Sequence, residues 1–139
     1  MKKILNLVLI LSLCSLFIVG CGNTKKAAMD AEAYSKALSE AELSVDELEV
    51  YTSETDPNEL LGRPNQYTSK VNFKNGSVEV FGNEKDVKAR KEYIDSLGKS
   101  TPMFAEYSYI NGNALLRIKS ELTPEEAKKY EESFMKIEK

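Results

Sequence analysis

The chain has 139 residues, a formal net charge of −3, no histidine and only two cysteines. The absence of histidine excludes Ser-His-Asp and Cys-His catalysis and the most common metal ligand, so we expect neither a metal nor another cofactor. No basic stripe with interleaved aromatic residues appears, and we therefore expect no nucleic-acid partner.

The first twenty residues have the pattern of an export signal. Lys2 and Lys3 precede an uncharged apolar run over residues 4–19. As a helix, this run would reach only about 24 Å, which is shorter than the roughly 30 Å hydrocarbon core of a bilayer. We therefore predict a cleavable signal peptide over residues 1–20 rather than a permanent transmembrane helix.

The end of this run, Ile18-Val19-Gly20-Cys21, resembles the lipobox of bacterial lipoproteins. The resemblance implies that the Cys21 thiol receives a diacylglyceryl group and that the chain is cut just before it. Two acyl chains form a stable anchor, because each buried CH₂ group contributes about 0.8 kcal/mol. We expect lipid on Cys21 to hold the protein at the extracytoplasmic face of the cell membrane. An ordinary signal peptide with a chance cysteine is the alternative.

The next two segments are predicted to lead into the folded domain. Residues 21–26 are polar and without periodicity, which is typical of a tether. Apolar residues recur at helical spacing over residues 27–44, among them Ala31, Tyr34 and Leu38. This spacing predicts an N-terminal helix, which either docks on the domain or forms a stalk.

A single domain is predicted over residues 45–139. It opens with a weak edge-strand signal, in which Leu48 and Val50 alternate with acidic side chains. The segment from Asp56 to Gly62 has a capping residue, a following proline and a closing glycine, which together predict one or two helical turns.

The loop around this segment carries the candidate partner-binding residues Leu60, Leu61, Arg63 and Tyr67. Arginine and tyrosine are common anchors of protein interfaces, so the loop is a candidate surface for a protein partner. The alternative is that the two leucines fill the edge of the sheet.

The rest of the chain reads as two units, each a hairpin followed by a helix. In the first unit, Asn75-Gly76 predicts a type I′ turn, which sets Phe73 opposite Val78. A helix is predicted over residues 83–97, with an asparagine as its cap and Gly98 as its stop.

In the second unit, Asn111-Gly112 predicts the same turn and sets Glu106 opposite Arg117, a pair of opposite charges across the strands. Thr123-Pro124-Glu125-Glu126 has the pattern of a capping box at the start of the last helix. The predicted fold is α+β: a four-stranded antiparallel sheet from two ββα units, with helices packed on one face and an N-terminal helix before them.

Three stretches resemble small Gram-positive lipoproteins of unknown function: DPNELLGRP at 56–64, YTSKV at 67–71 and GNALLR at 112–117. This resemblance implies no activity. We predict a lipid-anchored, extracytoplasmic and non-enzymatic binding or accessory module with a protein partner. The alternatives are a small cell-envelope hydrolase that uses the carboxyl groups of Glu79 and Glu106, or a purely structural envelope protein.

Overall fold

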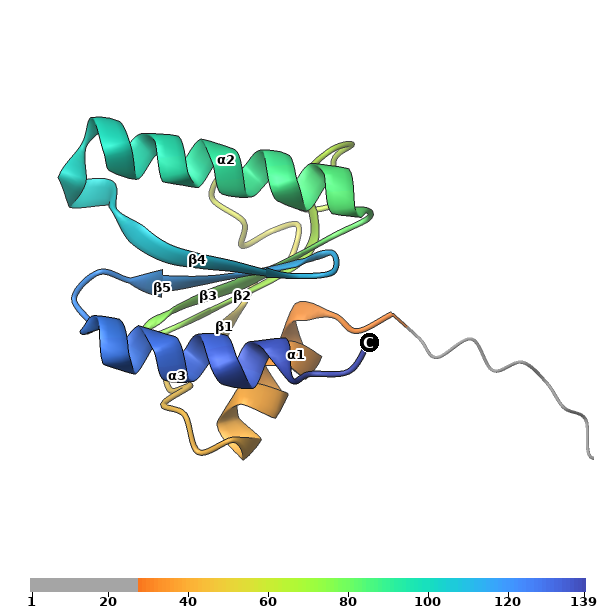
Figure 1. Ribbon diagram of the computed structural model, residues 1–139. Helices are drawn as coiled ribbons and strands as arrows, with labels where there is room; N and C mark the ends of the chain where they lie inside the picture. The colour runs from red at the N-terminus through yellow and green to blue at the C-terminus, as the bar shows by residue number, and fades with distance from the viewer. Residues whose placement is uncertain (1–27) are drawn as a thin grey trace, which may run out of the picture.

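The computed structural model describes residues 28–139 (Figure 1). The predicted signal peptide, the tether and Cys21 lie outside the described residues. The elements, in chain order, are α1 (Ala31–Glu40), β1 (Glu49–Val50), β2 (Tyr67–Phe73), β3 (Gly76–Phe81), α2 (Glu84–Ser100), the short 3₁₀ helix η1 (Pro102–Phe104), β4 (Glu106–Asn111), β5 (Ala114–Lys119) and α3 (Pro124–Met135).

The sheet has five strands in the order β1-β2-β3-β5-β4, and all neighbouring pairs are antiparallel. The predicted α+β class is confirmed, but the predicted number of four strands is wrong. The fifth strand is β1, which pairs Glu49 with Asn72 and Val50 with Val71 at one edge. Its sequence signal is weak because only two of its residues join the ladder.

Helices cover both faces of the sheet, which corrects the prediction that they share one face. Figure 1 shows α1 and α3 below the sheet and α2 above it. Leu116 of β5 belongs to the core cluster that includes α1 and α3. Its neighbour Leu115 points to the other face, where it packs with Phe81 and with Val87 of α2. Because both faces carry apolar side chains, one layer of helices cannot bury them all.

The N-terminal helix α1 is part of the domain. Its residues Ala31, Tyr34 and Leu38 are buried, and the Tyr34 ring centroid lies 5.5 Å from that of Phe134 on α3. Within the described residues, no helix is both long and apolar enough to cross a membrane.

The first hairpin is displaced by two residues from the predicted register. Phe73 pairs with Gly76 instead of Val78, so the turn falls one position earlier than predicted. Gly76 does not supply the positive φ of a type I′ turn. A Cβ atom at this position would lie 2.0 Å from the carbonyl oxygen of Arg117. Glycine is therefore needed here because β3 and β5 approach closely.

The second hairpin is displaced by two residues in the opposite sense. Asn111 pairs with Ala114, which makes Gly112 the first turn residue, with a φ of +62°. A glycine with positive φ at this position is what a type II′ turn uses. A displacement of two residues returns every side chain to its predicted face, so the predicted faces of both hairpins are correct even though the register is not.

The helix starts follow the sequence closely. Asn83 caps α2 by accepting a hydrogen bond from the amide of Asp86, and Thr123 forms a complete capping box with Glu126. The predicted stop at Gly98 is wrong, because α2 continues to Ser100.

Candidate functional site

A cluster of charged side chains is buried between α2 and the sheet. Glu79 of β3 is 0% exposed and stands at its centre. Arg90 of α2 donates two hydrogen bonds to its carboxylate, at 2.9 and 3.1 Å. Arg117 of β5 donates a third at 2.9 Å, and the Lys70 Nζ lies 3.5 Å away. One carboxylate thus joins β2, β5 and α2.

Strand register brings these residues together. Lys70 is directly opposite Glu79 in the β2–β3 ladder, and Ser77, two residues before Glu79, is opposite Arg117 in the β3–β5 ladder. Because side chains alternate along a strand, these four residues point to the same face. α2 covers part of this face and adds Arg90.

Arg117 also binds Glu106 of β4, with Nε and Nη2 at 2.7 and 3.0 Å from its two oxygens. This confirms the predicted ion pair, although Arg117 is opposite Ser108 in the ladder and reaches Glu106 diagonally. The two carboxyl groups considered for a hydrolase, those of Glu79 and Glu106, therefore share one face and one arginine.

The pKa directions follow from burial and charge. Burial alone would raise the pKa of Glu79, but the Arg90 hydrogen bond and the charges of Arg117 and Lys70 hold it below its usual range. Burial lowers the pKa of Lys70; Glu79 opposes this shift, and Arg117 and Arg90 add to it. Glu79 is therefore a permanent anion at neutral pH, which is the opposite of what a general acid requires.

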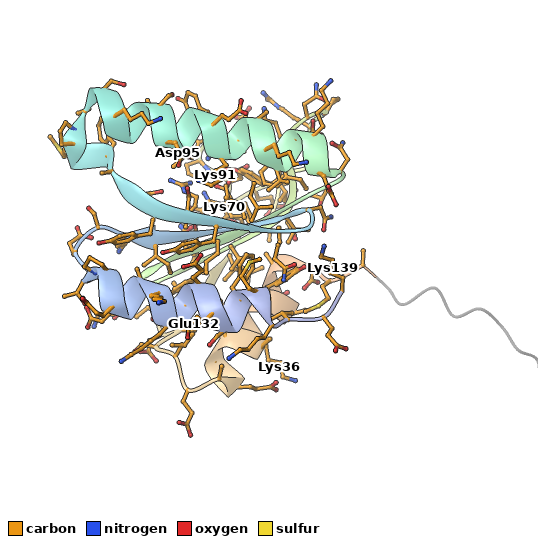
Figure 2. The ribbon with its side chains drawn as sticks, in the orientation of Figure 1. Lys36, Lys70, Lys91, Asp95, Glu132 and Lys139 are labelled. Atoms are coloured by element: carbon orange, nitrogen blue, oxygen red, sulfur yellow. The ribbon has the colours of Figure 1, made fainter. Side chains whose placement is uncertain are left out.

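A second polar cluster fixes α2 above β4. Figure 2 shows Lys91 and Asp95 on the side of α2 that faces the sheet. The Lys91 Nζ lies 2.7 Å from a carboxylate oxygen of Asp95 and donates to the Ser108 hydroxyl at 2.9 Å. Ser108 in turn donates to Asp95 at 2.7 Å. The three groups satisfy one another and tie α2 to the sheet.

A polar pocket of about 440 Å³ opens beside the Glu79 cluster, over the part of the sheet near the first hairpin turn. Its lining includes Lys70, Asn72, Ser77 and Arg117. A second pocket of about 260 Å³ adjoins it and shares Glu106, Arg117 and Lys119 with it.

One part of the wall of the second pocket is apolar and includes Ile94, Leu97, Met103 and Phe104; the rest is polar or charged. Met103 is 81% exposed and Phe104 is 56% exposed. Polar and apolar surfaces therefore meet at one end of the molecule, where η1 enters β4.

Both described chain ends lie at the other end of the molecule (Figure 1). Ala28 lines a pocket of about 330 Å³ with Gly82 and Asn113, and the Lys139 side chain lies against Gly112. The Gly112–Asn113 turn and the Lys74–Asn75 turn are at opposite ends of the antiparallel sheet. The two adjoining pockets are thus at the end remote from Ala28.

The loop predicted to bind a partner is organised around the buried Asp56. This carboxylate accepts hydrogen bonds from the amides of Leu60 and Leu61 at 2.7 and 2.8 Å and from the Tyr67 hydroxyl at 2.8 Å. Burial alone would raise the pKa of Asp56, but these hydrogen bonds lower it. The segment forms turns rather than the predicted helix, because Asp56 binds amides of the loop instead of capping a helix.

The four predicted loop residues are not equally accessible. Tyr67 is 0% exposed, and Leu60 and Leu61 are partly buried against the cluster of Phe81, Val87 and Leu115. Arg63 is exposed and pairs with Glu59 at 3.2 Å. The leucines therefore fill the edge of the core, as the alternative interpretation proposed, and Arg63 is the one exposed side chain of the four.

Sequence reasoning missed Lys70, Ser77 and Arg90 as members of a site. Lys70 carried a usable signal, since Lys70 and Glu79 are on the same face of the hairpin both in the predicted register and in one displaced by two residues. Arg90 carried none, because its contact with Glu79 depends on which face α2 covers. Within residues 28–139, no group of three or more acidic or cysteine side chains is placed to hold a metal ion.

No protein-family model, curated protein or solved structure matches this chain significantly.

Proposed function

We propose that this protein is a lipid-anchored, extracytoplasmic binding module that holds a protein partner at the cell membrane without catalysing a reaction. The lipobox-like residues 18–21 support the anchor. The observation that carries the binding role is the position of the adjoining pockets and of Met103 and Phe104, at the end of the domain remote from Ala28.

The length of chain before the domain supports this orientation. Six residues separate Cys21 from Ala28. A chain spans at most about 3.6 Å per residue, so a lipid on Cys21 would keep the Ala28 end within about 25 Å of the headgroups. The end with the pockets would then be directed away from the membrane and toward partners.

The chemistry of the surface favours binding over catalysis. Methionine and aromatic side chains are enriched in the buried centres of protein interfaces, and Met103 and Phe104 offer both types together. A glycoside hydrolase needs one carboxyl group with a raised pKa. The pKa of Glu79 is lowered instead, and its oxygens are occupied by Arg90 and Arg117.

The test combines fractionation with site-specific photo-cross-linking of the full chain in its own cells. We expect the membrane fraction of native cells to give a chain whose intact mass begins at a diacylated Cys21, and the Cys21→Ser variant to lack the mass of the acyl groups. A photo-cross-linker in place of Met103 should give one discrete adduct, which the Phe104→Ser change removes. The same cross-linker in place of Lys128, an exposed residue of α3, serves as the control.

The outcomes separate the two parts of the proposal. A native chain that begins at another residue, or that lacks the mass of the acyl groups, contradicts the anchor. An adduct formed equally from Met103 and Lys128, or from neither, contradicts the binding end. If a photo-cross-linker in place of Arg63 is the only one that gives an adduct, the partner binds the 60–67 loop instead.

A further inference from the structure

The charges buried beside the larger pocket do not balance. Three cations, Lys70, Arg90 and Arg117, surround the carboxylates of Glu79 and Glu106. This leaves one positive charge in excess, in a place where burial makes an uncompensated charge costly. An anion in the pocket would offset it.

Ser77 supplies a hydrogen-bond donor at the floor of this pocket. It is only 7% exposed and lines the pocket between Asn72 and Arg117, its two cross-strand neighbours. Every other polar side chain of the cluster has a partner, but within the described chain the Ser77 hydroxyl has none. Among the described residues, every fully buried side-chain nitrogen or oxygen has a partner, so the Ser77 hydroxyl is open to the pocket and can donate to a ligand atom there.

Arg117 has donors left for the same ligand. A guanidinium group carries five N–H groups, and Arg117 uses three of them on Glu106 and Glu79. The remaining two and the Ser77 hydroxyl are donors open to a ligand, and the Lys70 ammonium, which pairs with Glu79 at 3.5 Å, adds positive charge beside them. This is the donor set that a carboxylate or a phosphate would require.

The charges around the pocket indicate whether its ligand carries one negative charge or two. The excess in the cluster is one positive charge, and the rim of the pocket carries Glu47 and Glu49 as well as Lys74 and Lys119. The two acids and the two lysines of the rim cancel, so a dianion would leave one negative charge uncompensated. A monoanion, such as a carboxylate, fits the balance.

The apolar part of the adjoining pocket indicates what lies next to the anionic group of the ligand. Arg117 and Lys119 line both pockets, and Met103 and Phe104 line the second. We propose that the two pockets together bind a carboxylate with an apolar neighbour, the carboxylate against Ser77, Lys70 and Arg117 and the apolar group against Met103 and Phe104. The inference rests on the binding role proposed above for this end of the domain, but not on the anchor. A peptide C-terminus with an apolar last side chain, or a free short-chain fatty acid, presents this chemistry.

The test is calorimetric titration of the full chain in lipid nanodiscs. The probes are N-acetyl-Ala-Leu with a free carboxylate, the same peptide as its C-terminal amide, hexanoate and inorganic phosphate. We expect the free acid to bind at least about tenfold more tightly than the amide, because the amide lacks the charge. Ser77→Ala should weaken binding of the free acid about tenfold, and Met103→Ser severalfold. Ser96→Ala, on the exposed part of α2, should change nothing.

Circular dichroism of each variant verifies that it is folded. Binding of the peptide acid but not hexanoate identifies a peptide terminus, and the reverse identifies a free acid; either supports the inference. Equal binding of acid and amide, tighter binding of phosphate, or an unchanged Ser77→Ala variant overturns it. If neither acid binds but the cross-link from Met103 still forms, the carboxylate pocket is wrong and the proposed binding end is not contradicted. Acid binding without the adduct contradicts the proposed protein partner instead.

Discussion

Glu79 joins three elements through its two carboxylate oxygens. Arg90 comes from α2, Arg117 from β5 and Lys70 from β2, and all three contacts lie within 3.5 Å. Replacing a buried ion pair by a fitted apolar group can be neutral, whereas removing one member leaves the others unpaired. The packing of α2 on the sheet therefore depends on this single carboxylate.

We predict that Glu79→Gln lowers the free energy of unfolding by about 3–5 kcal/mol, because three cations lose their common counter-ion. Denaturant-induced unfolding measures this change. Glu132→Gln is the matched control, since Glu132 on α3 pairs with Lys128 at 3.9 Å and both side chains are exposed. Its effect should stay below about 0.5 kcal/mol. Equal effects of the two substitutions would show that the buried cluster is not structurally important.

At the scale of the elements, glycines fix where strands can meet. Gly76 lies where β3 pairs with Ile118 of β5, and any Cβ there would meet the Arg117 carbonyl group. Gly82, just after β3, has open space around its position. The same residue type is thus obligatory at one end of β3 and dispensable at the other.

Gly76→Ala should destabilise the protein by about 2–3 kcal/mol, because the backbone of β3 or β5 must move to admit a methyl group. Gly82→Ala should change stability by less than about 1 kcal/mol, since neither a clash nor a positive φ opposes it. Thermal and urea unfolding of both variants provide the comparison. A Gly76→Ala variant as stable as Gly82→Ala would mean that the two strands can separate without cost.

At the scale of the whole molecule, two helical layers enclose a sheet whose faces differ in chemistry. One face is apolar and packs on α1 and α3. The other face combines a small apolar cluster with the charges around Glu79. Stability of the domain is therefore expected to depend on pH through carboxyl groups that are charged and paired in the folded state.

The pKa values of Asp56, Glu79 and Asp95 are lowered in the folded protein. In the unfolded chain, these carboxyl groups have their ordinary pKa of about 4. The unfolded chain therefore binds more protons than the folded chain as the pH falls through and below that value. We expect the free energy of unfolding to be constant between about pH 5 and 7 and to fall below about pH 4.

Asp56→Asn should reduce this acid dependence, because one of the carboxyl groups whose pKa is lowered in the folded state is gone, and should also lower stability at neutral pH. Urea unfolding at a series of pH values measures both effects. An acid dependence identical to that of the native chain would rule out Asp56 as a contributor.

The sequence by itself determined the features that depend on neighbouring residues. The caps at Asn83 and Thr123 use side chains three residues from their partners, and the alternation within each hairpin assigns every side chain to its face. The turn register was not determined in this way, because a displacement of two residues preserves that alternation. The ion pair between Glu106 and Arg117 was predictable for the same reason: both residues remain on one face in either register.

Tertiary structure alone decided which layer covers each face. Both faces carry apolar residues, so periodicity within the strands cannot assign α2 to one of them. That assignment brings Arg90 to Glu79. Among residues 28–139, no side chain or backbone group binds the Ser77 hydroxyl at the floor of a pocket. Tyr67 is buried and not on the surface because the carboxylate of Asp56, eleven residues earlier, accepts a hydrogen bond from its hydroxyl group. Contacts of this kind join segments that meet only after the chain has packed, and no local pattern encodes them.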